Sequence, residues 1–314
     1  EDEIYIEESS SSSVTDTEAY QEIISLLSED LTSDDAYQKI ESLIDVDEFL
    51  NYFMSEIYFA NTDWAGGNLK AWKRIINGKW RWILYDTDFG FSCYGNNYNT
   101  NTFSNATKNI TFSGLMNNPI MKEKLMSKFV VHLGTTFQPE RVIHILDSLN
   151  SNIAEEALIY REYLVENETV EADRDIDIEN MKVFAEKRPS MVFGHLSSFL
   201  SLGDTLGIRI YADEKGTRFT LNDEPIKCSD FRSYYYAGSN LRIKAEAPNG
   251  YKFDHWEIAS KKDIIIKKDE WSYYDDGSLE AANWQANDFD DSAWKKGVAP
   301  LGFGMSSSIA TIVN

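Results

Sequence analysis

The stretch that decides the fold is Ile44–Phe91, with the sequence IDVDEFLNYFMSEIYFANTDWAGGNLKAWKRIINGKWRWILYDTDFGF. Its first third predicts a helix, because Asp45 can cap the N-terminus, Glu48 follows three residues later, and apolar residues then recur at helical spacing. The remainder loses that spacing, and alternating residues and turn residues take over. We therefore expect one helix followed by strands.

Residues Leu69–Tyr85 predict a β-hairpin that turns at Asn77-Gly78. This dipeptide is typical of a two-residue type I′ turn, in which both central residues have positive φ. Trp80 and Trp82 alternate along the second strand and so share one of its faces. We expect this hairpin to be exposed.

Side-chain oxygens gather on both sides of the hairpin. Asp63 and Asn68 precede it. Asp86 and Asp88 follow its second strand, with Phe89-Gly90 behind them. A helix end and a hairpin can bring such groups to one edge of a sheet, where carboxylate and amide oxygens suit Mg²⁺. Phosphoryl transfer needs these ligands, and it needs one carboxylate to orient the attacking hydroxyl. The order Asp-x4-Asn, hairpin, Asp-Phe-Gly therefore predicts a phosphoryl-transfer site.

Other interpretations of the same residues stay open. The spacing Asp-x4-Asn is short, and Asp175 with Asn180 matches it equally well. Asp63 can simply cap a turn, and Asp86 and Asp88 can simply end a strand, which are common uses of aspartate. Metal-dependent hydrolysis would use the same acidic edge. The hairpin also carries a basic cluster, which we interpret as solvated edge-strand charge with contact to phosphate as the alternative. This cluster consists of Lys73, Arg74, Lys79 and Arg81.

The rest of the chain predicts an α+β protein of several domains. Helical patterns lie at about 17–29, 34–43, 119–134, 139–165 and 178–200, and short alternating strands follow from 206. We expect four regions: an acidic Ser-rich linker at 1–16, a helix-rich domain with the hairpin at 17–205, a small β domain at 206–270, and the start of a β-sandwich at 271–314. Tyr251, Phe253 and Trp256 are the expected core residues of the small β domain.

Composition narrows the range of partners. The net charge of -22 repels nucleic acid phosphates and anionic membrane surfaces, so we expect neither as a partner. No apolar run is long enough for a transmembrane helix, so we expect no membrane span. Cys93 and Cys228 are expected to lie in different domains as free thiols.

Ile44–Phe91 closely resembles the CotH family of spore-coat protein kinases. Two downstream segments resemble its helical part: LMNNPIMKEKLMSKFVVHLGTTFQPERVIHILDSL at 115–149 and MKVFAEKRPSMVFGHLSSFL at 181–200. The resemblance covers about residues 15–203. It implies a kinase-like C-lobe that uses ATP with Mg²⁺ or Mn²⁺. It also implies transfer of the γ-phosphate to Ser or Thr of secreted, coat or surface proteins of bacteria.

The same resemblance assigns roles to the site residues. Asp63 takes the position of the catalytic-loop aspartate, and Asn68 that of the metal-binding asparagine. Asp88 takes the position of the Asp-Phe-Gly-type metal aspartate, and Asp86 matches the first acidic residue of the family's Asp-x-Asp. One departure is small, because Ala65-Gly66-Gly67 stands where relatives often carry a bulkier residue.

A larger departure lies upstream. The family's N-terminal lobe, with its nucleotide-holding Lys and Glu, is not found before Asp63. We therefore expect residues 1–314 to be inactive by themselves, since the γ-phosphate would not be positioned. We also expect an exposed apolar patch near Trp72, Trp80 and Trp82, which that lobe would otherwise cover.

The C-terminal regions suggest an alternative function. Residues 206–270 resemble the small β repeats of bacterial surface proteins, and 271–314 looks like the opening of a galactose-binding-like sandwich. In the alternative, the chain is a cell-surface structural or adhesion protein. The kinase-like domain would then be a scaffold, and the β modules would bind glycan or cell wall. Both interpretations place the protein outside the cell or on its surface.

Overall fold

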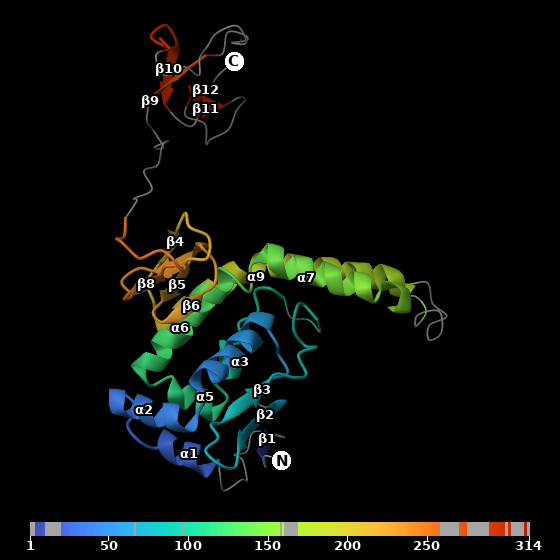
Figure 1. Cartoon of the computed structure of the whole chain (residues 1–314). Coiled ribbons are helices and arrows are strands. Elements are labelled where there is room, and N and C mark those ends of the chain that lie inside the picture. Colours follow the sequence, from blue (N-terminus) through green and yellow to red (C-terminus); the bar gives the residue numbers. More distant parts are fainter. Residues whose placement is uncertain are drawn as a thin grey trace. The chain divides into compact units, whose positions relative to one another are not determined.

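The computed structural model describes residues 4–9, 20–65, 67–93, 95, 97–157, 159, 169–257, 270–274, 289–298, 301–302 and 311–312. The chain divides into two compact units, Glu1–Phe253 and Asp254–Asn314. Helices and small antiparallel sheets are mixed in the first unit, which confirms the α+β expectation at that level (Figure 1). Within the described ranges, every helix is too short or too polar to cross a membrane.

The first helices begin where their capping residues predict. Helix α1 spans Gln21–Leu27, α2 spans Asp34–Leu43 and α3 spans Val46–Phe59. The Ser33 side chain accepts a hydrogen bond from the Ala36 amide, and the Asp45 side chain accepts one from the Glu48 amide. The predicted helix after Asp45 is thereby confirmed. Most of α3 is buried, so it forms the centre of the core.

A three-stranded antiparallel sheet lies beside α3, in the order β1-β2-β3 (Figure 1). Its strands are β1 (Ile4–Ser9), β2 (Leu69–Arg74) and β3 (Arg81–Ile83). The linker prediction is therefore wrong for Ile4–Ser9, and the remainder of 1–16 lies outside the described residues. The predicted hairpin is also not a free-standing pair, because β2 is the central strand. The physical reason is that an uncovered strand edge leaves backbone groups unpaired, and β1 pairs with that edge of β2.

The hairpin strands are confirmed, but the predicted type I′ turn is wrong. Trp72 pairs with Arg81, so the connection is longer than two residues. Asn77 has a positive φ of 54°, whereas Gly78 is not among the residues with positive φ. Gly78 is needed for close approach instead, because a Cβ there would lie 2.3 Å from the Arg74 carbonyl oxygen.

The indole rings of the hairpin are part of the core. Trp80 and Trp82 are 0% and 3% exposed, so the predicted exposed patch is wrong for both, and Trp72 is half-buried. The Tyr20 ring meets Trp80 edge-on at 5.0 Å between centroids, and Phe49 meets Trp82 edge-on at 4.6 Å. Elements of this chain therefore cover the face that we expected to be open.

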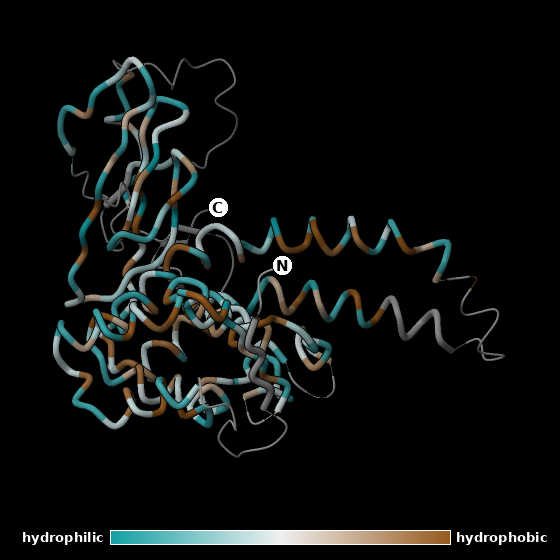
Figure 2. Tube along the Cα trace, turned by 60° about the horizontal axis from the view of Figure 1, so that its bottom comes forward, coloured by the Kyte–Doolittle hydropathy of each residue, from teal (hydrophilic) through white to brown (hydrophobic). Residues whose placement is uncertain are grey.

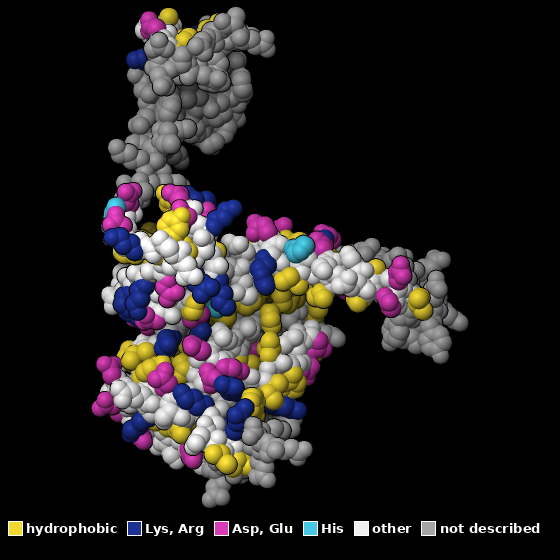
Figure 3. Space-filling model, in the orientation of Figure 1, with side chains coloured by type: hydrophobic (Ala, Val, Ile, Leu, Met, Phe, Trp, Pro, Cys, Tyr) yellow, Lys and Arg dark blue, Asp and Glu magenta, His cyan; other side chains and the backbone are white. Residues whose placement is uncertain are grey.

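Short helices α4 (Phe103–Ala106) and α5 (Ile110–Leu115) lead to α6 (Pro119–Leu133). The long helices α7 (Pro139–Asn152) and α9 (Thr169–Leu200) follow and form an arm beside the core. Helix α7 begins at Pro139 as predicted and ends at Asn152. Figure 2 shows α7 and α9 running side by side, where Lys182 and Asp147 form an ion pair of 2.9 Å. Apolar side chains stay exposed on this arm (Figure 3), for example Leu149 at 58%.

The strands that follow α9 pack on α6 within the same compact unit. They are β4 (Thr205–Tyr211), β5 (Arg218–Leu221), β6 (Glu224–Ile226), β7 (Asp230–Tyr236) and β8 (Ile243–Glu246). They form a β4-β7 pair and a β6-β5-β8 sheet. Buried Lys128 of α6 pairs with Glu224 at 2.9 Å, and the Ser233 hydroxyl donates to the Val130 carbonyl at 2.7 Å. The change from helix to strand near 205 is as predicted, but these strands do not separate from the helices as a unit of their own.

The rings expected in the core of the β domain are exposed. Tyr251, Phe253 and Trp256 are 59%, 47% and 42% exposed, so this prediction is wrong. The physical reason is that residues 251–257 form no strand, so no sheet face buries these rings. That residues 206–270 are a surface-protein repeat stays a prediction.

The second unit contains short paired strands in its described part. Strand β9 (Glu270–Tyr273) pairs antiparallel with β10 (Lys295–Val298), and β11 (Leu301–Gly302) pairs parallel with β12 (Thr311–Ile312). Most of 271–314 lies outside the described residues. The galactose-binding-like module therefore stays a prediction.

Candidate functional site

Helix α3 leads into the first loop of the site, from Asn61 to Asn68. The helix ends at Phe59, and the capping residue Ala60, with a left-handed φ of 58°, turns the chain away from the helix axis. The buried side chain of Asn61 then accepts a hydrogen bond of 3.1 Å on Oδ1 from the Asp63 amide. Such local turns are common at asparagine. The turn leaves Asp63 exposed at the surface.

Asn68 closes this loop onto Asp63. Its Nδ2 donates to the Asp63 carbonyl oxygen at 3.1 Å and to Asp63 Oδ2 at 3.2 Å. The structure therefore brings the two residues of the Asp-x4-Asn motif together. Because the amide nitrogen is engaged, the amide oxygen is the atom of Asn68 that could bind a cation.

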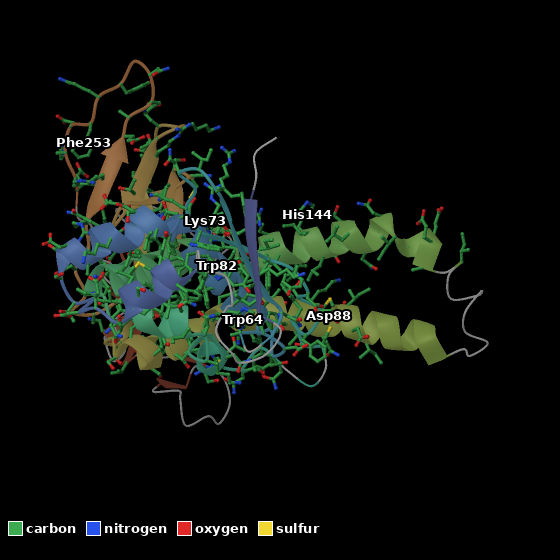
Figure 4. The ribbon with its side chains drawn as sticks, turned by 90° about the horizontal axis from the view of Figure 1, so that it is seen from below. Trp64, Lys73, Trp82, Asp88, His144 and Phe253 are labelled. Carbon is green, nitrogen blue, oxygen red and sulfur yellow. The ribbon has the colours of Figure 1, made fainter. Side chains whose placement is uncertain are left out.

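Strand β3 leads into the second loop, which carries Asp86 and Asp88. Asp86 has a positive φ of 54°. Partial desolvation, together with the like charges of Asp88 and Asp63, raises the pKa of Asp86. The charges of Asp63 and Asp88 therefore both act on Asp86. Figure 4 shows Asp88 near the point where α9 leaves the body of the unit. Partial burial raises the pKa of the Cys93 thiol, and the charges of Asp177 of α9 and of Asp88 add to the rise.

The Asp-Phe-Gly segment is anchored on the end of α3. The Phe91 amide donates a hydrogen bond of 2.9 Å to the Phe59 carbonyl. A Cβ at Gly90 would lie 3.1 Å from that same carbonyl oxygen and 3.0 Å from the Thr87 carbonyl oxygen. Glycine at this position therefore permits the backbone of the second loop to lie against the helix end.

One side chain connects the two loops. Besides accepting from the Asp63 amide, Asn61 donates from Nδ2 to Glu56 Oε2 at 2.9 Å and to the Asp86 carbonyl at 3.2 Å. Glu56 is fully buried in α3. Its burial raises its pKa to about 7, while hydrogen bonds from Asn61 and Tyr52 act in the opposite direction and the charge of Asp86 adds to the rise.

A polar stripe on α3 supports the same loops. We use this name for Glu48, Tyr52 and Glu56, which are spaced by four and so share one face of the helix. Glu48 Oε2 accepts a bond of 2.8 Å from the Trp82 amide of β3. The Tyr52 hydroxyl accepts one of 2.8 Å from Trp64 Nε1 in the first loop. The stripe therefore positions the hairpin and both loops from a single rigid element.

The backbone of both loops is in an uncommon conformation. Several of their non-glycine residues have positive φ, namely Ala60, Ala65, Asn68, Asp86, Phe91 and Ser92. Left-handed conformations are rare outside glycine, asparagine and aspartate, and they cost free energy unless surrounding contacts hold them. Such residues gather at functional sites, so their density here supports a functional assignment for these loops.

The donor set suits a hard divalent cation. Asp63, Asn68, Asp86 and Asp88 can offer oxygen ligands. The like charges of Asp88 and Asp63, which add to the desolvation that raises the pKa of Asp86, would be balanced by a positive ion. Across the described part of the chain, no three His, Cys, Asp or Glu side chains stand close enough to form a ready-made metal site. Mg²⁺ does not require one, because it is usually held by one or two carboxylates, water and substrate phosphates.

Two residues of the basic cluster of the hairpin, Lys73 and Arg81, form ion pairs with acidic side chains. Lys73 is only 12% exposed, forms an ion pair of 3.3 Å with Glu22, and lies 5.4 Å from the centroid of the Trp80 ring. The interpretation as solvated edge charge is therefore wrong for Lys73, because β1 makes β2 a central strand. Arg81 is 48% exposed and pairs with Asp45 at 2.8 Å. A contact between this cluster and phosphate stays a prediction.

The sequence predicted some of the site residues and missed others. The structure joins Asp63 to Asn68 by hydrogen bonds, and it places Asp63 and Asp88 where their charges act on Asp86. Sequence reasoning did not find Asn61 or the polar stripe. Two signals were available: polar residues at four-residue spacing in the predicted helix, and an asparagine two residues before Asp63.

One comparison with known proteins gives a match. A family model described as CotH kinase protein matches residues 2–192, which is more than half of the chain. No curated protein and no solved structure matches. The matched range includes β1, the polar stripe, both loops and most of α9.

Proposed function

Because the chain belongs to the CotH kinase protein family, we propose that it takes part in the transfer of the ATP γ-phosphate to serine or threonine hydroxyls of proteins. Its cofactors are ATP and Mg²⁺ or Mn²⁺. Its substrates are secreted, coat or surface proteins of bacteria, and the protein acts outside the cell or on its surface.

The observation that supports this proposal is the connection of the two loops through Asn61. The Asp63 amide and the Asp86 carbonyl both bond to this one buried side chain. Phosphoryl transfer depends mainly on positioning and electrostatic stabilisation, so a site of this kind needs its carboxylates held at constant separation. A connection through a buried side chain with several hydrogen bonds meets that need.

The proposal gives the site residues two tasks. Asp63 is exposed and orients the substrate hydroxyl, accepting its proton during transfer. Asn68, Asp88 and Asp86 hold the metal, whose chemistry is to neutralise the charge of the phosphate oxygens.

The test uses the natural protein at its full length, with residues 1–314 measured beside it. Transfer from γ-labelled ATP is followed with casein and with surface proteins as acceptors, in Mg²⁺ and in Mn²⁺. Asp88→Asn and Asp63→Asn each remove one charge without changing shape, and each should lower transfer at least about 100-fold. Asp213→Asn, at an exposed position in the β part, is the matched control and should leave transfer unchanged.

Three outcomes would contradict the proposal. The first is full transfer by Asp88→Asn, which would overturn the site assignment. The second is release of inorganic phosphate with no labelled protein, which would favour hydrolysis at the same edge. The third is absence of both reactions and of Mn²⁺–ATP binding in the full-length protein. That result would favour the scaffold alternative, in which the β modules bind glycan or cell wall.

A further inference from the structure

We propose that Asn61 is a positioning residue that sets the separation of the Asp63 loop and the Asp86–Asp88 loop, and that buried Glu56 orients the Asn61 amide for this task. The catalytic consequence rests on the proposed function above. The geometric part does not, because it concerns hydrogen bonds of this chain alone.

The geometry requires an amide at position 61. Oδ1 accepts from the Asp63 amide at 3.1 Å, while Nδ2 donates to the Asp86 carbonyl at 3.2 Å and to Glu56 Oε2 at 2.9 Å. One planar group therefore uses an acceptor for one loop and a donor for the other. Asn61 is fully buried, so water does not compete for these bonds. An aspartate would keep the acceptor and lose both donors.

Glu56 decides which way the amide faces. An asparagine side chain can exchange its oxygen and nitrogen by a half-turn, and its partners select the orientation. The Asp86 carbonyl and the Glu56 carboxyl are both acceptors, so together they hold the nitrogen on their side and leave the oxygen toward Asp63. Glu56 is itself fully buried, so water does not compete with its carboxyl oxygen for this bond.

A neighbouring contact supplies the matched control. Asn105 Nδ2 donates a solvent-exposed bond of 3.0 Å to the carbonyl of Thr62, in the same loop, but from a half-buried position outside the site. Asn105→Ala therefore removes an amide contact to the first loop without affecting its connection to the second. If loss of any contact loosened the first loop, Asn105→Ala would show the effect. An effect that requires loss of the connection between the loops should be absent from this variant.

The first measurement is amide hydrogen exchange, which does not depend on activity. Asn61→Ala removes the acceptor, so the Asp63 amide should exchange about tenfold faster, as loss of one hydrogen bond allows. Asn61→Asp keeps the acceptor, so the Asp63 amide should stay protected while the chemical shifts of Asp86–Asp88 change. Glu56→Leu should raise exchange at Asp63, and Glu56→Gln, which still offers an acceptor, should restore protection.

The second measurement is steady-state kinetics on the full-length protein. Asn61→Asp should lower kcat about 100-fold, since displacement of reacting groups by about 1 Å costs that much. KM for the protein substrate should change much less, because that substrate does not touch Asn61. Thermal unfolding of each variant shows whether it is folded at the assay temperature, and Glu56→Gln should recover most of the kcat that Glu56→Leu loses. Asn105→Ala should match the wild type in both measurements.

The outcomes separate the two proposals. Unchanged Asp63 exchange in Asn61→Ala, or equal effects of Asn105→Ala and Asn61→Ala, would overturn the positioning role. If Asn61→Ala does not fold, the isosteric Asn61→Asp decides through the Asp86–Asp88 shifts, and unchanged shifts would refute the connection. If the wild type transfers no phosphate, the proposed function fails, and the exchange data still decide the positioning role by themselves.

Discussion

Arg188 of α9 donates a hydrogen bond of 2.8 Å from Nε to the carbonyl oxygen of Tyr58, 130 positions earlier in the last turn of α3. The same guanidinium donates to the carbonyls of Ile57, Tyr98 and Thr100. The last carbonyls of a helix have no partner within it, and a cation is favourable at that end. Arg188 thus joins the arm to the end of α3, next to the site loops, and burial lowers its pKa to about 10.

Arg188→Met should destabilise the protein by about 3 kcal/mol or more, since several buried carbonyls lose their donor at once. Chemical denaturation followed by tryptophan fluorescence measures this change. Arg141 provides the control, because it donates to a carbonyl, that of Thr136, from an exposed position. Arg141→Met should alter the free energy of unfolding by less than about 0.5 kcal/mol. Equal effects of the two variants would contradict the role given to Arg188.

Gly90→Ala should cost about 1–3 kcal/mol of stability, because the new Cβ would press on the carbonyls of Phe59 and Thr87 and backbone cannot yield as a side chain does. Gly194→Ala in α9 is the control, since a Cβ there meets nothing within 4 Å. That variant should be as stable as the wild type or more stable by up to about 1 kcal/mol, as alanine favours helix. Both are measured by urea denaturation, and a stable Gly90→Ala would show that the second loop can shift away from α3.

The free energy of unfolding should fall as the pH rises from about 5 to 7, in part because of Glu56. Burial raises its pKa from 4.5 to about 7 in the folded protein, so over this window the folded state keeps a proton that the unfolded chain has released. Glu56→Gln cannot titrate, so it should lose this contribution to the pH dependence, which is at most about 3 kcal/mol over the whole window. Denaturation curves at pH 5 and pH 8 test the difference. Exposed Glu140→Gln should keep the wild-type slope, and an identical slope in Glu56→Gln would refute this cause.

Asn222→Gly should weaken the packing on α6 of the strands that follow α9, β4 to β8. Asn222 and Asp223 form a two-residue turn between β5 and β6, and both have positive φ. Glycine adopts positive φ without strain, so a glycine at either position leaves the backbone of the turn unchanged. The buried Asn222 amide, however, donates to Ser127 Oγ at 3.0 Å and to the Tyr235 hydroxyl at 2.8 Å. Its loss should cost about 2 kcal/mol, measured by thermal or urea unfolding.

Asp223→Gly is the matched control for that experiment. Its exposed side chain pairs with Lys244, and surface pairs of this kind contribute about 0–1 kcal/mol. If the two glycine variants lose the same stability, the buried amide is not what holds the β part on α6.

Local sequence signals determined the elements that carry the site. Asp45 caps α3 and Pro139 begins α7, and both boundaries depend on residues within one turn of the helix. The alternation around Trp82 predicted the hairpin strands in the same way. Asp63 and Asn68 were recognisable as a pair because five positions separate them, a distance that a single loop closes.

Only the tertiary structure decided what brings these elements together. The bond from Asn61 to Asp86 spans 25 positions and that from Arg188 to Tyr58 spans 130, and no local pattern records either partner. The pairing of β1 with β2, which makes β2 a central strand, is of the same kind. Neighbours along the chain determine whether a helix or a turn forms. The partner of a buried polar group is determined instead by which other polar groups are buried beside it when the chain folds. For that reason the sequence determined the carboxylates of this site, and only the tertiary structure decided that Asn61 and Glu56 hold them in place.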